Sequence, residues 1–184
     1  IIPYSTLEKF ISSDDVVYKV YNTNNPGMIF SWGKLDVDAT GFGYDLMRHS
    51  KAFFCASSEL IGLYDEGNDL RFSRYYDKYD FNNYDEGIFY VATKNYCKAS
   101  TANEAYDQAL RLEEAYLNRA EAYIEKGEHE LGMDDVNAIR AERIKGEYEL
   151  VANSVDEARE FYRLEKRLEF SFEGLRWFDI RRWG

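Results

Sequence analysis

The hydrophobic pattern of the chain takes on a helical period after Cys97. Apolar residues then recur at steps of four, four and three, at Leu112, Tyr116, Ala120 and Tyr123. This spacing places all of them on one face of a helix. Thr101 and Glu104 have the spacing of a capping box, and Gly127 is a terminating residue. The pattern therefore predicts a helix that opens at Thr101 and ends at Gly127.

Two further helices are predicted after this one. The second runs from about residue 130 to residue 144, with Met133, Val136, Ile139 and Arg143 on one side. Ser154 and Glu157 form another capping box, which opens the third helix. The apolar stripe of that helix is predicted to consist of Phe161, Leu164, Leu168, Phe172 and Leu175.

The first two predicted helices have the spacing of a tetratricopeptide-type helical hairpin. Aromatic, small and apolar residues fall where this repeat requires them, at Tyr116, Ala120, Tyr123, Gly127, Gly132, Val136 and Ile139. The small residues Ala120 and Gly132 would let the two helices approach closely. One such repeat cannot cover its own apolar faces, so we expect its neighbours to come from elsewhere. The chain is accordingly predicted to be a fragment without its N-terminal part.

The first 97 residues have a different pattern. The alternating segment VVYKVY at 16–21, the turn residues NTNNPG and the segment MIFSW at 28–32 predict a strand, a turn and a second strand. GIFYVATKNYC at 87–97 predicts a further strand. Residues 33–90 show no sustained period, which predicts a mostly irregular region with a short helix at 58–64. Long loops of this kind often carry binding sites.

These patterns predict one mainly α-helical domain over residues 1–184. It combines a loop- and strand-rich region at 1–97 with a helical scaffold at 98–184, in which C-terminal helices follow the hairpin. The chain has 184 residues, of which 45% are hydrophobic and 17% aromatic. This length and composition are typical of a folded globular protein with a sizeable core.

The charge of the chain narrows the classes of partner. A formal net charge of −11 and a pI near 4.7 argue against nucleic acid as a partner. The dense basic cluster of Arg176, Arg181 and Arg182 is interleaved with Glu173 and Asp179, which predicts a self-paired helix rather than a docking patch. No apolar run approaches the ~20 residues of a membrane-spanning helix.

No metal and no cofactor is predicted. Cys55 and Cys97 lie far apart and outside any CxxC spacing, so they are two buried thiols or a disulfide rather than metal ligands. His49 and His129 have no Cys or carboxylate at a metal-ligand spacing. Residues 36–47 begin like a calcium loop, but a methionine stands at the twelfth position, where a bidentate Glu is needed.

Carboxylates recur at every fourth position near the C-terminal end, at Glu165, Glu169 and Glu173. Like charges in a row repel one another unless cations neutralise them. We therefore expect a structural network with nearby arginines, namely Arg140, Arg143 or Arg167. A glycoside hydrolase, which needs two carboxyl groups about 5 to 10 Å apart in a cleft, stays open as an alternative.

The irregular region contains an aromatic cluster made of Tyr75, Tyr76, Tyr79, Phe81 and Tyr84. Trp32, which follows a predicted strand, is a further candidate. Sugars stack their C–H faces on aromatic rings while their hydroxyls bind polar groups, so these six residues are candidate ligand-binding residues. The same side chains could instead pin the loops and strands to the core, and both interpretations stay open.

Four long motifs follow one another in a fixed order. They are SSELIGLYDEGNDLRFSRYY at 57–76, LEEAYLNRAEAYIEKG at 112–127, MDDVNAIRAER at 133–143 and LEKRLEFSFEGLRWFDIRRWG at 164–184. With these motifs the chain resembles the SusD/RagB family of outer-membrane glycan-binding lipoproteins of gut and oral Bacteroidetes, over roughly residues 57–184. The lipidated cysteine, the first and mostly helical half and the proline-rich tail of that family are absent from this sequence.

The resemblance implies a SusD-like fold and a non-enzymatic protein that is lipid-anchored at the cell surface. It implies an oligosaccharide ligand and, as a partner, a TonB-dependent (SusC-like) outer-membrane transporter in polysaccharide utilisation. A peptide-binding helical-repeat scaffold is the remaining alternative, because the predicted hairpin also occurs in such proteins.

Overall fold

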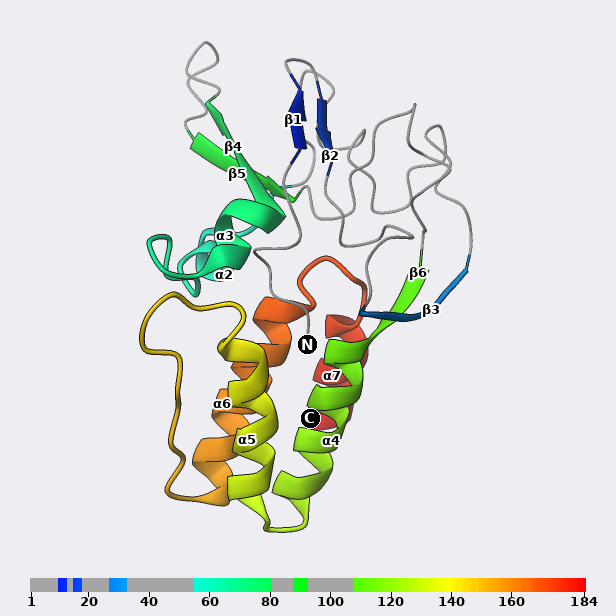
Figure 1. The fold of residues 1–184 in the computed structure, drawn as a ribbon, viewed down its shortest axis with the longest axis vertical. Coiled ribbons are helices and arrows are strands. Elements are labelled where there is room, and N and C mark those ends of the chain that lie inside the picture. Colours follow the sequence, from blue (N-terminus) through cyan, green and yellow to red (C-terminus); the bar gives the residue numbers. More distant parts are fainter. Residues whose placement is uncertain (1–9, 13–14, 18–26, 33–54, 81–87, 93–107) are drawn as a thin grey trace.

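The computed structural model describes residues 10–12, 15–17, 27–32, 55–80, 88–92 and 108–184. Its longer helices lie side by side, and short helices and strands lie beyond one end of them (Figure 1). The helices are α2 Ser58–Ile61, α3 Leu70–Tyr75, α4 Leu112–Glu125, α5 His129–Arg140, α6 Val155–Glu169 and α7 Arg176–Trp183. The fold is mainly helical, as predicted. None of the described helices is both long and apolar enough to cross a membrane.

Helices α4 and α5 form the predicted hairpin. Gly127 turns the chain between them at φ +84°, a left-handed conformation that favours glycine. At Gly132 a Cβ atom would lie 2.5 Å from Cγ1 of Ile124 and 2.9 Å from the carbonyl oxygen of Ala120. Only the absence of a side chain permits this approach, which confirms the role expected for the small residues.

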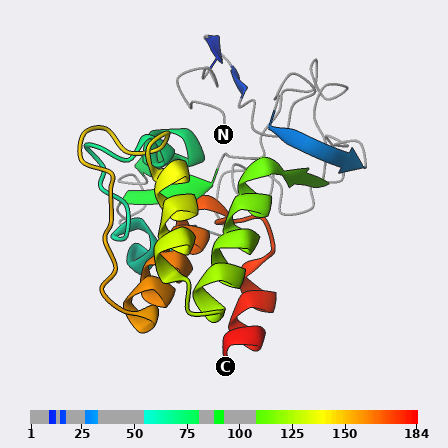
Figure 2. The ribbon, with the colours of Figure 1, turned by 60° about the horizontal axis from the view of Figure 1, so that its bottom comes forward.

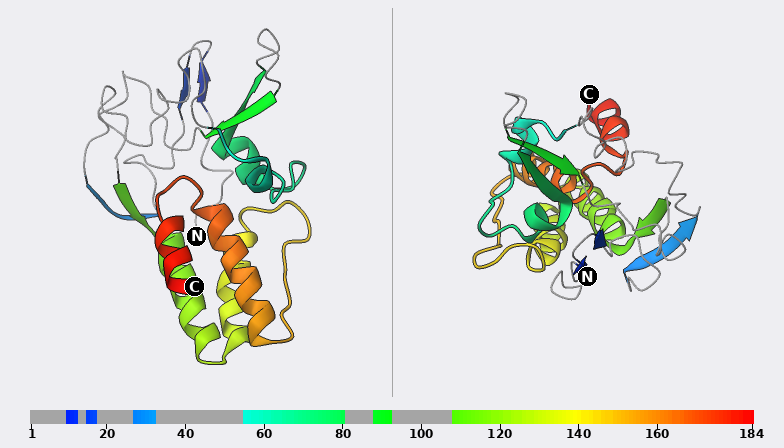
Figure 3. Two further views of the ribbon diagram at one scale, coloured as in Figure 1. Left: turned by 180° about the vertical axis from the view of Figure 1, so that it is seen from behind. Right: turned by 90° about the horizontal axis from the view of Figure 1, so that it is seen from above.

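Helix α6 packs against both helices of the hairpin, and α7 lies beside α4 (Figures 1 and 3). Their shared core consists of Leu117, Ala120, Ile124, Met133, Val136, Ile139, Ala152, Ala158, Tyr162 and Phe170. A second cluster under the loop-rich region consists of Tyr64, Phe72, Tyr75, Tyr76 and Leu168. Helix α6 contributes to both clusters and therefore links the two regions.

The bounds of the first two long helices differ from the prediction. The capping box at Thr101 and Glu104 lies outside the described residues, but the segment just before α4 is strand β6, Gln108–Arg111, so the helix opening at Thr101 is wrong. Helix α5 ends at Arg140 rather than near residue 144. The reason is tertiary, since Ile144 forms a β-bridge with Asp69 and cannot remain helical.

The third predicted helix begins as expected and ends early. Oγ of Ser154 accepts a hydrogen bond from the backbone N–H of Glu157 at 3.2 Å, which confirms the cap. The helix stops at Glu169 because Phe172 (φ 61°) and Gly174 (φ 79°) turn the chain before α7. The single stripe that was predicted to include Phe172 and Leu175 is therefore divided between a helix and a turn.

The described strands form three antiparallel pairs. They are β1 Phe10–Ser12 with β2 Asp15–Val17, β3 Met28–Trp32 with β6, and β4 Tyr76–Asp80 with β5 Ile88–Ala92. The predicted strands at 28–32 and 87–97 are confirmed within their described parts. The strand–turn–strand unit is wrong, because β2 and β3 pair with other partners. Pattern reasoning also missed α3 and β4, which lie in the segment predicted to be irregular.

Candidate functional site

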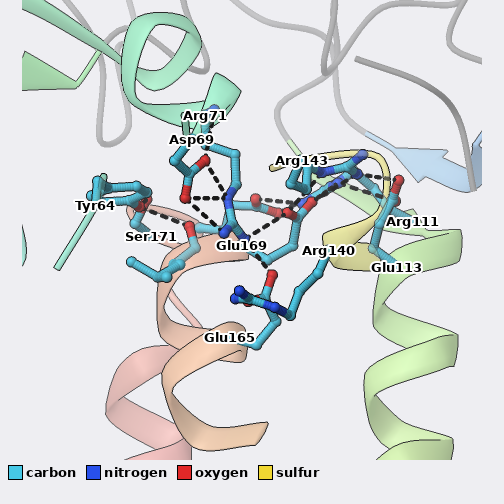
Figure 4. Close-up of polar contacts among 12 residues, drawn as sticks. Tyr64, Asp69, Arg71, Arg111, Glu113, Arg140, Arg143, Glu165, Glu169 and Ser171 are labelled. Atoms are coloured by element: carbon cyan, nitrogen blue, oxygen red, sulfur yellow. Dashed lines mark hydrogen bonds and ion pairs between the residues drawn. The ribbon is translucent and has the colours of Figure 1, made fainter. Parts of the chain in front are cut away.

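A network of buried ion pairs joins α3 to the helical scaffold (Figure 4). Its members are Asp69, Arg71, Arg111, Glu113, Arg140, Arg143, Glu165, Glu169 and Glu173. Arg71, Arg143 and Glu169 have no exposed surface. Buried charges are tolerated only when they are paired and hydrogen-bonded, so these contacts determine how the segments fit together.

Backbone hydrogen bonds hold the start of α3 in place beside the end of the helical hairpin. The N–H of Leu70 donates to the carbonyl of Arg143 at 2.8 Å, and the N–H of Lys145 donates to the carbonyl of Asn68 at 2.9 Å. Asp69 caps α3 by accepting from the N–H of Arg71 at 2.9 Å. The cap and the bridge together aim the side chain of Arg71 toward α6.

Arg71 is the arginine through which the loop-rich region contacts α6. Its Nε and Nη2 donate to the two oxygens of Asp69 at 2.9 and 2.8 Å, and its Nη1 donates to Glu165. Burial disfavours the charged guanidinium, but the attraction of Glu165 and Asp69 outweighs burial and raises the pKa of Arg71. Arg71 therefore stays charged.

Arg143 and Arg111 complete the network around the end of α6. Nη2 of Arg143 donates to Glu113 at 2.9 Å, and Nη1 of Arg111 donates to the same carboxylate at 3.1 Å. Arg111 also donates to Glu169 at 3.2 Å and to Glu173 at 2.8 Å. The end of β6, helices α4 and α6, and the loop after α5 thus meet at one group of charged side chains.

The expected pairing of the row of acids on α6 with arginines is confirmed. Arg140 donates to Glu165 at 3.1 Å, and Arg143 binds Glu169. Arg167 does not join them and instead donates to Glu59 at 2.9 Å. The remaining members Arg71, Arg111, Glu113 and Asp69 were missed. Of these four residues, only Asp69 could have been recognised from the local sequence, because it is a capping residue before an apolar segment.

Three hydroxyl groups lie next to this network. The hydroxyl of Tyr64 donates to the carbonyl of Leu168 at 2.8 Å and lies 3.1 Å from Oγ of Ser171. The hydroxyl of Tyr76 donates to the same Oγ at 3.0 Å. Burial raises the pKa of both tyrosines, so both phenols remain protonated and hold β4 against the end of α6.

The predicted aromatic cluster does not form one surface in the described residues. Tyr75 and Tyr76 are 1% and 4% exposed and belong to the core, which is the structural interpretation that the sequence left open. Trp32 is opposite Gln108 in the β3–β6 pair, and Tyr79 is opposite Phe89 in the β4–β5 pair. Phe81 and Tyr84 lie outside the described residues.

The structure describes only some of the cysteines and histidines that the sequence analysis considered as metal ligands. Cys55 is half-buried, whereas Cys97, His49 and residues 36–47 lie outside the described residues. His129 is the first residue of α5. In the described part of the chain, no group of three His, Cys, Asp or Glu side chains could hold a metal ion.

The basic cluster on α7 is only partly self-paired. Arg182 binds Asp179 at 3.2 Å, one turn earlier on the helix, and also binds Glu121 on α4. Neither Arg176 nor Arg181 forms an ion pair with another described residue. The prediction of a self-paired helix is thus confirmed for Arg182 and wrong for the other two.

Comparisons with known proteins identify the family. A search of curated proteins finds no match. A crystal structure of a SusD-like protein from Bacteroides fragilis is 34% identical, with a TM-score of 0.42, over 53% of this chain and 19% of that one. This chain thus spans about a fifth of the length of that relative. The model of the SusD family matches residues 18–184. The chain therefore belongs to the SusD family.

Proposed function

We propose that the chain is the core part of a non-catalytic outer-membrane protein, lipid-anchored at the cell surface, that binds oligosaccharides and delivers them to a TonB-dependent transporter. Membership of the SusD family over residues 18–184 carries this proposal. The long motifs that resemble glycan-binding lipoproteins agree with it, and they include every residue of the network of ion pairs except Arg111.

The bonding of the conspicuous acids favours binding over hydrolysis. A glycosidase needs a carboxylic acid that can donate a proton, placed near a second carboxylate in a cleft. Glu165, Glu169 and Glu173 each accept hydrogen bonds from guanidinium groups instead. Carboxylates that are paired with guanidinium groups in this way hold segments of the fold together, which favours a structural role for them.

Four aromatic residues of the loop-rich region are the proposed sugar contacts. Trp32, Tyr79, Phe81 and Tyr84 retain this role because aromatic rings stack on the C–H faces of sugars. Trp32 belongs to β3 and Tyr79 to β4 of the loop-rich region, and binding residues commonly lie in such regions. Tyr75 and Tyr76 are no longer candidates, because their buried rings have no face available for a pyranose.

The first test is calorimetry of the purified protein with a panel of soluble oligosaccharides, followed by an assay of reducing ends. Saturable binding without new reducing ends is the expected result. New reducing ends would show that the protein is a glycoside hydrolase. Affinity for a peptide panel in place of the sugars would identify the chain as a peptide-binding scaffold.

The second test concerns the contact residues. Trp32→Ala and Tyr84→Ala should each weaken the binding of an oligosaccharide about threefold to tenfold, as expected for the loss of one stacking ring. Tyr148→Ala is the matched control, since Tyr148 is an exposed tyrosine of the segment between α5 and α6. Equal effects of all three changes would contradict the assignment.

The third test concerns the partner. The full-length protein, tagged and extracted with detergent from outer membranes, should co-purify with a TonB-dependent transporter. The delivery role would be contradicted if the protein is recovered without any transporter under conditions that preserve other outer-membrane complexes. The sugar-binding role would not be affected by that result, because calorimetry tests it separately.

A further inference from the structure

Helix α3 runs directly into strand β4. The helix ends at Tyr75 and the strand begins at Tyr76, so no linker separates the two elements. All five residues of β4 pair with β5, from Tyr76 opposite Ala92 to Asp80 opposite Ile88. Because the whole strand is held in this ladder, the orientation of α3 and of the first residue of β4 determines where the rest of the strand lies.

The N-terminal end of α3 is attached to α6 by Arg71. Nη1 of this buried guanidinium donates to Glu165, which lies 94 positions later in the chain, while Nε and Nη2 bind Asp69 at 2.9 and 2.8 Å. Breaking a buried ion pair is costly, because it leaves a charge without its partner. The pairing of Arg71 therefore favours one arrangement of α3 against α6.

The other end of α3 is attached through Tyr76. Its side chain is 4% exposed, and its hydroxyl donates at 3.0 Å to Oγ of Ser171, which follows α6. The ring packs edge-on against Tyr64 and Phe172, with centroids 5.4 and 6.1 Å away. Arg71 and Tyr76 thus attach the unit of α3 and β4 at two points, and two points limit a rotation that one point would allow.

One proposed sugar contact lies on the strand that these attachments hold. Tyr79 is the third residue after Tyr76, so its backbone lies about 10 Å beyond the second attachment, at about 3.3 Å per residue. A small rotation at the start of β4 therefore displaces Tyr79. A binding residue that is already held in the bound orientation gains affinity, because less freedom is lost when the sugar binds.

We propose that Arg71 and Tyr76 are positioning residues for the sugar contact at Tyr79. They hold the unit of α3 and β4 in one orientation against α6, and the affinity for an oligosaccharide depends on that orientation. The proposal rests on the proposed function, because Tyr79 is a proposed contact. Both attachments are buried within the described part of the chain, so they do not depend on what covers its surface.

Trp32 offers an internal comparison. It lies on β3, which pairs with β6, and the pairs β3–β6 and β4–β5 lie on opposite sides of the region beyond the long helices (Figures 1 and 2). Changes at distant residues that share no partner have additive effects on a free energy. A change at Tyr76 that acts through Tyr79 should therefore add to the effect of Trp32→Ala and should not add to that of Tyr79→Ala.

The first experiment measures the position of β4 without a sugar. Spin labels are attached to Lys78→Cys on β4 and Glu160→Cys on α6, both exposed positions, after the native cysteines have been replaced by serine. Double electron–electron resonance gives the distribution of distances between the two labels. Tyr76→Phe and Arg71→Lys should each widen this distribution, because each change weakens one of the two attachments.

The second experiment measures double-mutant cycles on the dissociation constant of the oligosaccharide that the parent protein binds most tightly in the calorimetric panel. Tyr76→Phe should weaken binding about threefold and Arg71→Lys about tenfold, because each lowers the population of the binding-competent orientation. Neither loss should appear in the Tyr79→Ala background. The threefold loss of Tyr76→Phe should persist in the Trp32→Ala background.

Gly132→Ala is the control for a general loss of stability, because its methyl group would disturb the contact between α4 and α5 rather than β4. It should change neither the distance distribution nor the dissociation constant. Circular dichroism should show that every variant is folded at the temperature of the measurements. A merely structural role of Arg71 and Tyr76 would lower the unfolding temperature, as Gly132→Ala does, and would leave the affinity of the folded protein unchanged.

Three outcomes would overturn the proposal. An unchanged distance distribution in both variants would show that neither residue positions β4, whether or not a sugar binds. A wider distribution with an unchanged dissociation constant would show that binding does not depend on this orientation. Losses of affinity that persist in the Tyr79→Ala background would show that the two residues act on another contact.

The proposed function fails in a different way. If the parent protein binds no oligosaccharide of the panel, sugar binding is contradicted and the positioning of a sugar contact is contradicted with it. The distance distribution still decides in that case whether Arg71 and Tyr76 hold β4 in one orientation.

Discussion

Arg143 holds both carboxylate oxygens of Glu169, with its Nε 3.1 Å from Oε2 and its Nη2 3.2 Å from Oε1. This two-point pair is buried and joins the loop after α5 to the end of α6. Arg71 and Arg111 contact the same carboxylate. A single acid thus neutralises part of the charge of three arginines from three separate segments, and the stability of the junction depends on it.

Glu169→Ala should destabilise the protein by about 3 to 5 kcal/mol, because it leaves buried guanidinium groups without their shared counter-charge. Urea unfolding followed by tryptophan fluorescence measures the loss. Glu160→Ala is the control, since Glu160 is an exposed acid of the same helix, and it should change stability by less than about 0.5 kcal/mol. Equal losses in the two variants would show that the network contributes little.

Gly132→Ala should separate α4 from α5. The new methyl group would lie 2.5 Å from Cγ1 of Ile124 and 2.9 Å from a backbone oxygen, so a cost of about 1 to 3 kcal/mol is expected from overpacking. The midpoint of thermal unfolding measures this cost. Gly67→Ala is the control. Its new methyl group would lie 3.5 Å from the nearest atom outside the two adjacent residues, so the midpoint should be nearly unchanged. An unchanged midpoint in Gly132→Ala would mean that the hairpin is looser than the structure indicates.

The protein should lose stability above pH 10. Burial raises the pKa of Tyr64 and Tyr76 above 10.0, the ordinary value of tyrosine, so above that pH the unfolded chain releases protons that the folded chain retains. The stabilisation is complete below pH 10 and declines as the pH rises toward the folded pKa values. Urea unfolding at pH 8 to 11 measures the decline.

Tyr64→Phe should lower stability at neutral pH by about 1 kcal/mol, through the loss of its hydrogen bond to the Leu168 carbonyl. It should also make the alkaline decline shallower than in the parent. If the stability of the variant declines above pH 10 as steeply as that of the parent, groups other than Tyr64 cause the decline.

Glu121 should make the attachment of α7 sensitive to acid. Burial disfavours the ionised carboxyl, but hydrogen bonds from Arg182, Trp183 and Tyr162 outweigh burial and lower the pKa of Glu121 below 4.5. Its stabilisation is therefore complete above pH 4.5 and is lost as the pH falls through the lower, folded value.

Glu121→Gln should reduce the free energy of unfolding at pH 7 by about 1 kcal/mol. At strongly acid pH the stability of this variant should approach that of the parent protein. Unfolding by urea between pH 3 and pH 7 compares the two proteins. A difference that stays constant over this range would show that ionisation of this carboxyl is not involved.

The helical hairpin could be predicted closely because its determinants are local. The apolar positions of α4 and α5, the glycine between them and the cap at Ser154 act over three or four residues, which is the range of helical hydrogen bonds. The small residue at Gly132 also predicted how closely the helices approach. The pairing of Glu165 and Glu169 with arginines followed from the repulsion between like charges on one helix face.

The remaining contacts depend on segments that are distant in sequence. Arg71 and Glu165 are 94 positions apart, and no local period connects them. The early ends of α5 and α6 could not be predicted from the local sequence either. A β-bridge ends α5, and a turn at positive φ ends α6. Tyr75 and Tyr76 had the composition of a binding loop, and only their packing against α6 placed them in the core.

The sequence by itself determined the family, the helical scaffold and the need to neutralise a row of acids, because motif order, helical period and charge spacing are properties of neighbouring residues. The tertiary structure decided which arginines neutralise those acids and which tyrosines are buried. These depend on the desolvation of charged and aromatic groups, and desolvation is established only when distant segments come together.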